Sequence, residues 1–180
     1  MPTEPLFLTR SDLTKAAFFP GSSIGNFEPS QAQILLERIA QLLGSEGALL
    51  VGVDLKKAPQ RLNTAYNDAQ GITAAFNLNL LTRINRELKA NFEISQFFHH
   101  AFYNQELGRI EMHLVSNQSQ EVQVDGQTFA FAEGESIHTE NSYKYTVEQF
   151  HGIASDAVLL PEQVWTDDSE LFSVHCLRVK

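Results

Sequence analysis

Ala16-Ala-Phe-Phe-Pro-Gly-Ser-Ser23 and Gly47-Ala-Leu-Leu-Val-Gly-Val-Asp54 are the two stretches that decide the fold. Each contains a short apolar run, typical of a strand buried in a parallel sheet, and the first run stops at a Pro-Gly loop. Between them Ile and Leu recur at helical spacing from Pro29, which suits a first helical turn, to Gly44, and Ser30 lies near the expected cap. The order of strand, helix and strand predicts one βαβ unit.

The middle of the chain has a different character. Residues 59–66 have a short helical pattern, and a longer helix is predicted where apolar residues recur at every fourth position. Those positions are Ile72, Phe76, Leu80, Ile84 and Leu88. From residue 97 to residue 145 apolar and polar residues alternate, which predicts antiparallel strands with a hairpin turn at Asp125-Gly126.

A helix and two strands are predicted to close the chain, over residues 147–154, 158–165 and 171–179. This order favours an α/β fold, a doubly wound, Rossmann-like sheet interrupted by an inserted α+β domain. We expect residues 1–55 and 146–180 to form the sheet domain and residues 56–145 the insertion. The sheet is only partial, because one βαβ unit and a strand pair are present and no G-x-G-x-x-G loop occurs.

The charge of the chain excludes several classes of partner. The formal net charge is −9, and no basic cluster extends beyond Lys56-Lys57, so a nucleic-acid-binding protein is not expected. Residues 1–14 lack the apolar core of a signal peptide, and the longest apolar run is too short to span a membrane. We therefore expect a cytoplasmic protein without a membrane partner.

The cysteine and histidine content predicts neither a disulfide nor a metal site. Cys176 is the single cysteine, and its apolar surroundings predict a buried structural thiol rather than a nucleophile. The six histidines show no i, i+4 pairing with a carboxylate, so no metal site is expected from the sequence.

Six segments together resemble the histidine Nα-methyltransferase family, which uses S-adenosylmethionine to trimethylate the α-amine of L-histidine on the route to ergothioneine. They lie in order at residues 19–27, 54–57, 65–77, 84–88, 109–114 and 139–145. The resemblance covers nearly the whole chain from Phe18 onward. It implies a split methyltransferase domain with a substrate-binding domain inserted late in the sheet.

The resemblance also implies that this chain corresponds to the C-terminal portion of a family member. In the family, the glycine-rich donor loop, the acidic residue for the ribose and the adenine-binding segment precede the point that matches Phe18. The chain is therefore expected to lack the donor-binding half and to be inactive alone. Gly21 matches a glycine near the methyl donor and is the one cofactor contact that we carry over.

Asn26 and Tyr66 are the expected ligands of the substrate carboxylate. Asn26 follows a strand of the sheet at the edge where open α/β sheets bind ligands, and by resemblance it matches the family asparagine that binds this carboxylate. Tyr66 matches the family tyrosine that reaches the same group, and an amide with a phenol is a neutral way to hold an anion. From the residues alone, the alternative for Asn26 is a turn residue with an unusual backbone angle, and for Tyr66 a partly buried anchor.

Glu140 and Ser142 alternate along a predicted strand and should point to one face. By resemblance they match the pair that binds the imidazole ring, and Met112 matches a methionine lining the same pocket. From spacing alone, Glu140 and Ser142 would be solvent-exposed polar residues, and a methionine on a strand is more often part of the core.

The expected function is S-adenosylmethionine-dependent methylation of the α-amine of L-histidine. Two alternatives stay open. The chain can be a non-catalytic amino-acid-binding remnant or the subunit of a split enzyme with a separate N-terminal half. It can also serve a methyltransferase for another amino acid, such as an indole amino acid. An exposed sheet edge would further favour a homodimer.

Overall fold

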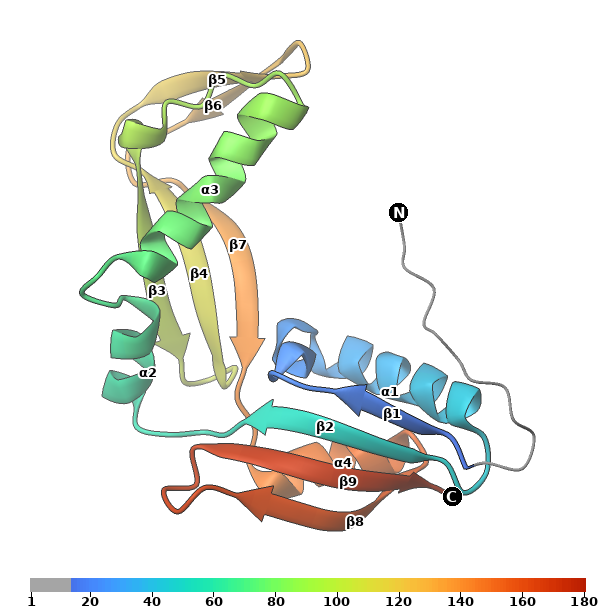
Figure 1. Cartoon of the computed structure of the whole chain (residues 1–180). Helices are drawn as coiled ribbons and strands as arrows, with labels where there is room; N and C mark the ends of the chain where they lie inside the picture. Colours follow the sequence, from blue (N-terminus) through green and yellow to red (C-terminus); the bar gives the residue numbers. More distant parts are fainter. Residues whose placement is uncertain (1–13) are drawn as a thin grey trace.

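The computed structural model describes residues 14–180, which form a four-stranded sheet, a three-stranded sheet and a two-stranded hairpin with helices packed against them (Figure 1). The first sheet has the strand order β1-β2-β9-β8. Its strands are β1 (Ala16–Phe19), β2 (Ala48–Asp54), β9 (Phe172–Val179) and β8 (Leu159–Thr166). β1 pairs with β2 in parallel, as the βαβ pattern predicts, and the other pairs are antiparallel. The expected closing strand pair is therefore confirmed.

Helices α1 (Pro29–Leu43) and α4 (Val147–Asp156) pack against the same face of this sheet. Leu36 of α1 and Phe150 of α4 are fully buried there with Leu49 and Val51 of β2. The capping residue of α1 differs from the expectation: Glu28 caps the helix through a reciprocal pair of bonds with Gln31, and Ser30 lies inside the first turn.

The second sheet has three strands in the order β3-β4-β7, with the β5-β6 hairpin beyond it. The strands are β3 (Phe97–Asn104), β4 (Arg109–Ser116), β5 (Gln120–Val124), β6 (Gln127–Phe131) and β7 (Ser136–Tyr143). All pairs are antiparallel, and Asp125 and Gly126 form the hairpin turn with positive φ angles of 47° and 79°. Helices α2 (Pro59–Tyr66) and α3 (Ile72–Glu87) and the short helix η2 (Ile94–Gln96) complete this part.

The buried face of α3 differs from the predicted apolar stripe. Ile72 and Phe76 are 65% and 66% exposed, whereas Leu81 and Asn77 are buried. Asn77 is tolerated in the interior because its amide donates to the carbonyl of His113 and contacts His99 Nδ1. The helix is therefore rotated from the stripe that every-fourth-residue spacing indicated.

Two expectations of burial in the first sheet are wrong. β1 was predicted to be a buried strand, but it lies at the sheet edge and Phe18 is 70% exposed. Cys176 was predicted to be buried, but it is only half-buried, because Ser173, His175 and Leu177 are the inward-facing residues of β9. Burial and the neighbouring Glu162 raise the pKa of the Cys176 thiol, which agrees with a non-nucleophilic role.

The chain leaves the first sheet after β2 and returns to it after β7. The two connections lie side by side, because Leu55 and Tyr145 form an isolated parallel bridge and Lys56 N–H donates to the carbonyl of Tyr145. Residues between them form the second sheet with α2 and α3. No helix within residues 14–180 has the length and apolar character that crossing a bilayer requires. The signal-peptide expectation for residues 1–14 falls almost wholly outside the described residues.

Candidate functional site

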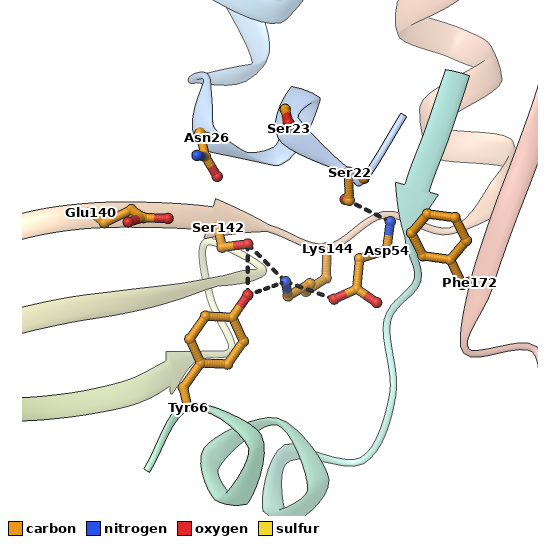
Figure 2. Close-up of a pocket in the computed structure, with 10 residues that line it drawn as sticks. Ser22, Ser23, Asn26, Asp54, Tyr66, Glu140, Ser142, Lys144 and Phe172 are labelled. Atoms are coloured by element: carbon orange, nitrogen blue, oxygen red, sulfur yellow. Dashed lines mark hydrogen bonds and ion pairs between the residues drawn. The ribbon is translucent and has the colours of Figure 1, made fainter. Parts of the chain in front are cut away.

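A cavity of about 330 Å³ lies where the ends of β1 and β2 face β7 and α2. Both sheets therefore contribute walls, and Figure 2 shows the side chains that converge there. The lining residues are Gly21, Ser22, Ser23, Asn26, Asp54, Tyr66, Glu140, Ser142, Lys144 and Phe172.

The loop after β1 reaches the cavity through two positive φ angles, 74° at Gly21 and 57° at Ser22. It continues as the short helix η1 (Ser23–Asn26), which packs closely on β7. A Cβ at Gly25 would lie 2.7 Å from the carbonyl oxygen of Tyr143, so only glycine allows this approach. The close contact sets Asn26 beside the cavity (Figure 2).

Lys144 is the buried cation of the site, with 2% of its surface exposed. Its ammonium lies 2.7 Å from Asp54 Oδ2, 2.9 Å from the Tyr66 hydroxyl and 2.8 Å from Ser142 Oγ. An ammonium has three donors, and these three acceptors use all of them. Lys144 therefore fixes the positions of Tyr66 and Ser142 and ties both to the end of β2.

Tyr66 and Ser142 also contact each other, since the phenol donates to Ser142 Oγ at 3.0 Å. Lys144 donates to both oxygens, so the hydroxyl protons of Tyr66 and Ser142 are the ones that a ligand can redirect. The sequence indicated a neutral pair of carboxylate ligands, Asn26 and Tyr66. In the structure this pair is not isolated from charge, because the Lys144 ammonium donates a hydrogen bond to the phenol oxygen of Tyr66.

The Glu140 side chain makes no hydrogen bond or ion pair with any other residue in the range 14–180, although it is half-buried. Burial raises the pKa of the Glu140 carboxyl, and the nearby Lys144 ammonium only partly offsets this. A half-buried carboxylate without a hydrogen-bond partner would be stabilised by any N–H donor that a ligand brings. Figure 2 shows Glu140 and Ser142 on the same side of β7, as the alternation predicted.

Five of the six residues singled out from the sequence line this cavity: Gly21, Asn26, Tyr66, Glu140 and Ser142. The sixth, Met112, is not among the lining residues. It is buried in a core cluster with Leu62, Ala101 and Ile110, on the strand that pairs with β7 at Glu140. A pocket role for Met112 stays a prediction.

Sequence reasoning missed five lining residues: Ser22, Ser23, Asp54, Lys144 and Phe172. Lys144 had a usable signal, because Glu140, Ser142 and Lys144 continue one alternation and share a side of the strand. Asp54 ends a predicted strand, but nothing in the sequence around it indicates that its partner is Lys144, 90 positions later. The backbone N–H of Asp54 is held by Ser22 Oγ at 2.8 Å.

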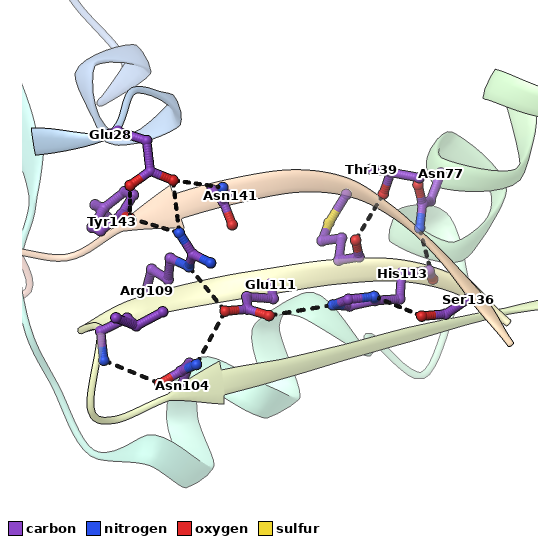
Figure 3. A network of polar contacts seen from close by, with 12 residues as sticks. Glu28, Asn77, Asn104, Arg109, Glu111, His113, Ser136, Thr139, Asn141 and Tyr143 are labelled. Atoms are coloured by element: carbon purple, nitrogen blue, oxygen red, sulfur yellow. Dashed lines mark hydrogen bonds and ion pairs between the residues drawn. The ribbon is translucent and has the colours of Figure 1, made fainter. Parts of the chain in front are cut away.

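A polar network beside the cavity joins α1 to the second sheet (Figure 3). Glu28 accepts from the Tyr143 hydroxyl at 2.5 Å and from Arg109 Nη1 at 2.8 Å, and Arg109 Nη1 lies 2.6 Å from the same hydroxyl. Arg109 Nε also donates to Glu111 at 2.9 Å. Burial raises the pKa of the Tyr143 phenol, which therefore stays protonated as the donor.

Comparison with known sequences gives the family. A profile described as "Histidine-specific methyltransferase, SAM-dependent" matches residues 5–179. The chain is 40% identical over 158 residues to the histidine N-alpha-methyltransferase of Mycolicibacterium smegmatis and 38% identical to that of Mycobacterium tuberculosis. Each match covers 87% of this chain and 49% of the relative, so the chain spans about half the length of these proteins.

Comparison with solved structures gives the fold. The CcbJ methyltransferase from Streptomyces caelestis superposes with a TM-score of 0.51 at 13% identity, over 92% of this chain and 61% of that chain. At this identity the likeness establishes the Rossmann-like methyltransferase architecture and nothing about substrates. With the profile match over almost the whole sequence, the chain belongs to the family of histidine-specific, S-adenosylmethionine-dependent methyltransferases.

Proposed function

We propose that this chain provides the amino-acid-binding part of an enzyme that methylates the α-amine of L-histidine. The observation that carries the proposal is the convergence of Asn26, Tyr66, Glu140 and Ser142 on one cavity. These residues come from η1, the end of α2 and β7, and the set spans residues 26 to 142 of the sequence. Their donors and acceptors complement a zwitterion that carries an imidazole.

The carboxylate of the substrate binds between Asn26 and Tyr66. The Asn26 amide offers N–H donors, and the Tyr66 hydroxyl can turn its proton from Ser142 to the ligand because Lys144 already donates to the phenol oxygen. The buried charge of Lys144 strengthens the phenol as a donor toward an anion.

The imidazole of the substrate binds at Glu140 and Ser142. Glu140 accepts from one ring nitrogen, and the Ser142 hydroxyl serves the other as donor or acceptor. A ligand with an apolar side chain would leave the half-buried Glu140 without a partner, which disfavours it. Glu140 is therefore the residue on which recognition of histidine depends most.

The methyl donor of the family, S-adenosylmethionine, supplies an electrophilic methyl group on a sulfonium. Of the described residues, Gly21 is suited to lie near that group, since a Cβ there would meet no atom within 4 Å and the space beside it is open. Asp54 does not fit the role of a ribose ligand, because Lys57 and Lys144 bind its two oxygens. The described residues thus fit only the reacting end of the donor.

Catalysis by these residues consists of positioning. Asn26 and Tyr66 at one end and Glu140 and Ser142 at the other would leave the α-nitrogen facing the side of Gly21, where the ammonium, after losing one proton to solvent, would present its lone pair to the methyl group of a bound donor. We also propose that residues 56–145 are the inserted substrate-binding domain and that residues 1–55 and 146–180 belong to the methyltransferase domain. The second sheet, α2 and α3 all lie between residues 56 and 145, which supports this division.

Titration calorimetry of L-histidine into the chain, with and without S-adenosylhomocysteine, tests the proposal. We expect Glu140→Gln to weaken histidine binding roughly 10- to 100-fold, because the hydrogen bond to the imidazole loses the negative charge of its acceptor. Glu121→Gln, on the exposed side of β5, is the matched control and should bind like wild type. A folded wild-type chain that fails to bind histidine, or a Glu140→Gln variant with unchanged affinity, would overturn the proposal.

A further inference from the structure

A second group of polar side chains lies on the other face of the β3-β4-β7 sheet. Ile110, Met112 and Leu114 of β4 point toward α2 and α3 and are buried there. Glu111 and His113 alternate with them and therefore point to the opposite face. This face is separate from the cavity that Glu140 and Ser142 line.

Glu111 and His113 are spaced as two ligands of one metal ion. His113 Nε2 lies 3.4 Å from Glu111 Oε2, which is longer than the 2.7–3.2 Å of a good N–H···O bond. Two ligand atoms about 2.0 Å from a tetrahedral zinc ion lie about 3.3 Å apart. The observed separation matches this geometry better than it matches a direct hydrogen bond.

Hydrogen bonds from neighbouring side chains hold Glu111 and His113 in place. Arg109 Nε and Asn104 Nδ2 donate to Glu111 Oε1 at 2.9 and 3.1 Å, which leaves Oε2 facing His113 (Figure 3). Ser136 Oγ lies 3.1 Å from His113 Nδ1 and fixes the ring with Nε2 toward Glu111. Partners of this kind orient metal-binding histidines and carboxylates in known sites.

His138 of β7 supplies a third donor atom. It pairs with His113 across the two strands, and their rings stack with centroids 4.5 Å apart at an interplanar angle of 14°. One donor atom from each of Glu111, His113 and His138 lies within 4.8 Å of the other two. His138 is exposed, so its ring is free to turn toward a bound ion.

We propose that Glu111, His113 and His138 form a binding site for a divalent transition metal ion, with Zn²⁺ as the best match. Two imidazoles and one carboxylate are a donor set that zinc uses when it keeps a fourth position open for water. Ca²⁺ and Mg²⁺ prefer oxygen ligands and fit it poorly. The helix-based spacing rule applied to the sequence could not find this trio, because its members lie on paired strands.

The surrounding charge favours a cation. The positive group bonded to the trio is Arg109, and it is bound by two carboxylates, Glu28 and Glu111. Glu28, Glu111 and Arg109 together thus carry a net negative charge before an ion binds, when the imidazoles of His113 and His138 are neutral. A bound ion would fasten β4 to β7 beside the register shift at Met112/His113, two residues from Glu140.

Zinc titration of the metal-stripped, tag-free chain tests the site, by calorimetry and by competition with a chromophoric chelator. We expect one Zn²⁺ per chain, with no binding of Mg²⁺ at equal concentration. His113→Ala and His138→Ala should each weaken zinc binding at least about tenfold, and Ser136→Ala should weaken it less. Circular dichroism checks that each variant is folded, and the exposed position of His138 makes that variant safe to interpret.

His100→Ala is the matched control. His100 lies opposite His113 on β3, where its ring packs against Phe102, but it lies outside the trio. This variant should bind zinc as wild type does. Absence of saturable zinc binding, or equal weakening by His100→Ala and His138→Ala, would overturn the assignment. The histidine-binding proposal would survive that result, because it depends on the cavity on the other side of the sheet.

Discussion

Lys144 Nζ lies 2.7 Å from Asp54 Oδ2, and this ion pair joins the end of β7 to the end of β2. The two residues are the points at which the chain leaves and re-enters the first sheet. Because Lys144 also holds Tyr66 and Ser142, the pair connects the sheet directly to two proposed substrate ligands. The stability of the fold and the proposed ligand binding therefore depend on one buried contact.

Replacing Lys144 with Met should lower the free energy of unfolding by roughly 3 kcal/mol, because Asp54 would lose its buried partner and keep only Lys57. Urea unfolding followed by circular dichroism measures this loss. The double variant Asp54→Asn, Lys144→Met should lose less than the sum of the two single variants, since removing both charges leaves neither one unpaired. Additive losses would show that the ion pair contributes no coupling.

Replacing Gly25 with Ala should lower the free energy of unfolding by roughly 1–3 kcal/mol, because the new methyl group would meet the Tyr143 carbonyl at 2.7 Å. The same substitution at Gly152 of α4 is the control, since a Cβ there meets nothing within 4 Å. Gly152→Ala should raise stability by roughly 0.5–1 kcal/mol through helix propensity. Thermal unfolding of both variants gives the comparison, and similar effects would contradict the close packing of η1 on β7.

Replacing Tyr143 with Phe removes the hydroxyl that bonds both Glu28 and Arg109. We expect a loss of about 1–2 kcal/mol in the free energy of unfolding, typical of a hydrogen bond to charged partners. Tyr103→Phe is the control, because no hydrogen bond of the Tyr103 hydroxyl occurs among residues 14–180. A Tyr143→Phe variant as stable as the Tyr103→Phe variant would mean that the Glu28 network does not hold the two sheets together.

The buried histidine of β9 should make stability depend on pH. His175 is fully buried between His151 Nε2 at 2.9 Å and Ser173 Oγ at 2.7 Å, and burial lowers the pKa of His175 from 6.5 to about 4. Below pH 6.5 the unfolded chain binds a proton at this residue that the folded chain does not, so stability falls as the pH falls toward 4.

The loss across this window should be roughly 3 kcal/mol, at about 1.4 kcal/mol per pH unit. Urea unfolding at several pH values between 7.5 and 4 measures it. A His175→Gln variant should give a flatter curve than wild type between pH 6.5 and pH 4. His138→Gln, at an exposed position, should keep the wild-type slope, and an unchanged slope for His175→Gln would count against this source of the pH dependence.

Local patterns were sufficient to predict most elements of the fold. The apolar run before Asp54, the Pro29 to Gly44 spacing and the Asp125-Gly126 turn each encode a structure within a few residues, and the structure has all three. The residues Asn26, Tyr66, Glu140 and Ser142 came from motif resemblance, and the fold brings them to one cavity.

Features that depend on distant partners could not be predicted. Asn77 can be buried because its amide donates to the carbonyl of His113 on β4. The residue spacing within α3 does not predict that hydrogen bond. Phe18 is exposed because β1 stands at the sheet edge, a property of strand order rather than of the strand's own sequence. Homodimer formation at this edge stays a prediction.

The parallel bridge between Leu55 and Tyr145 lies where both connections between the two sheets run side by side, so a rotation of one sheet relative to the other would turn about it. Such a rotation would swing Glu140 and Ser142 away from Asn26 without breaking the pairing of either sheet. The bonds of Glu28 with Arg109 and of Asp54 with Lys144 oppose that rotation, as does the close packing of η1 on β7, so these contacts keep Asn26 beside Glu140 and Ser142.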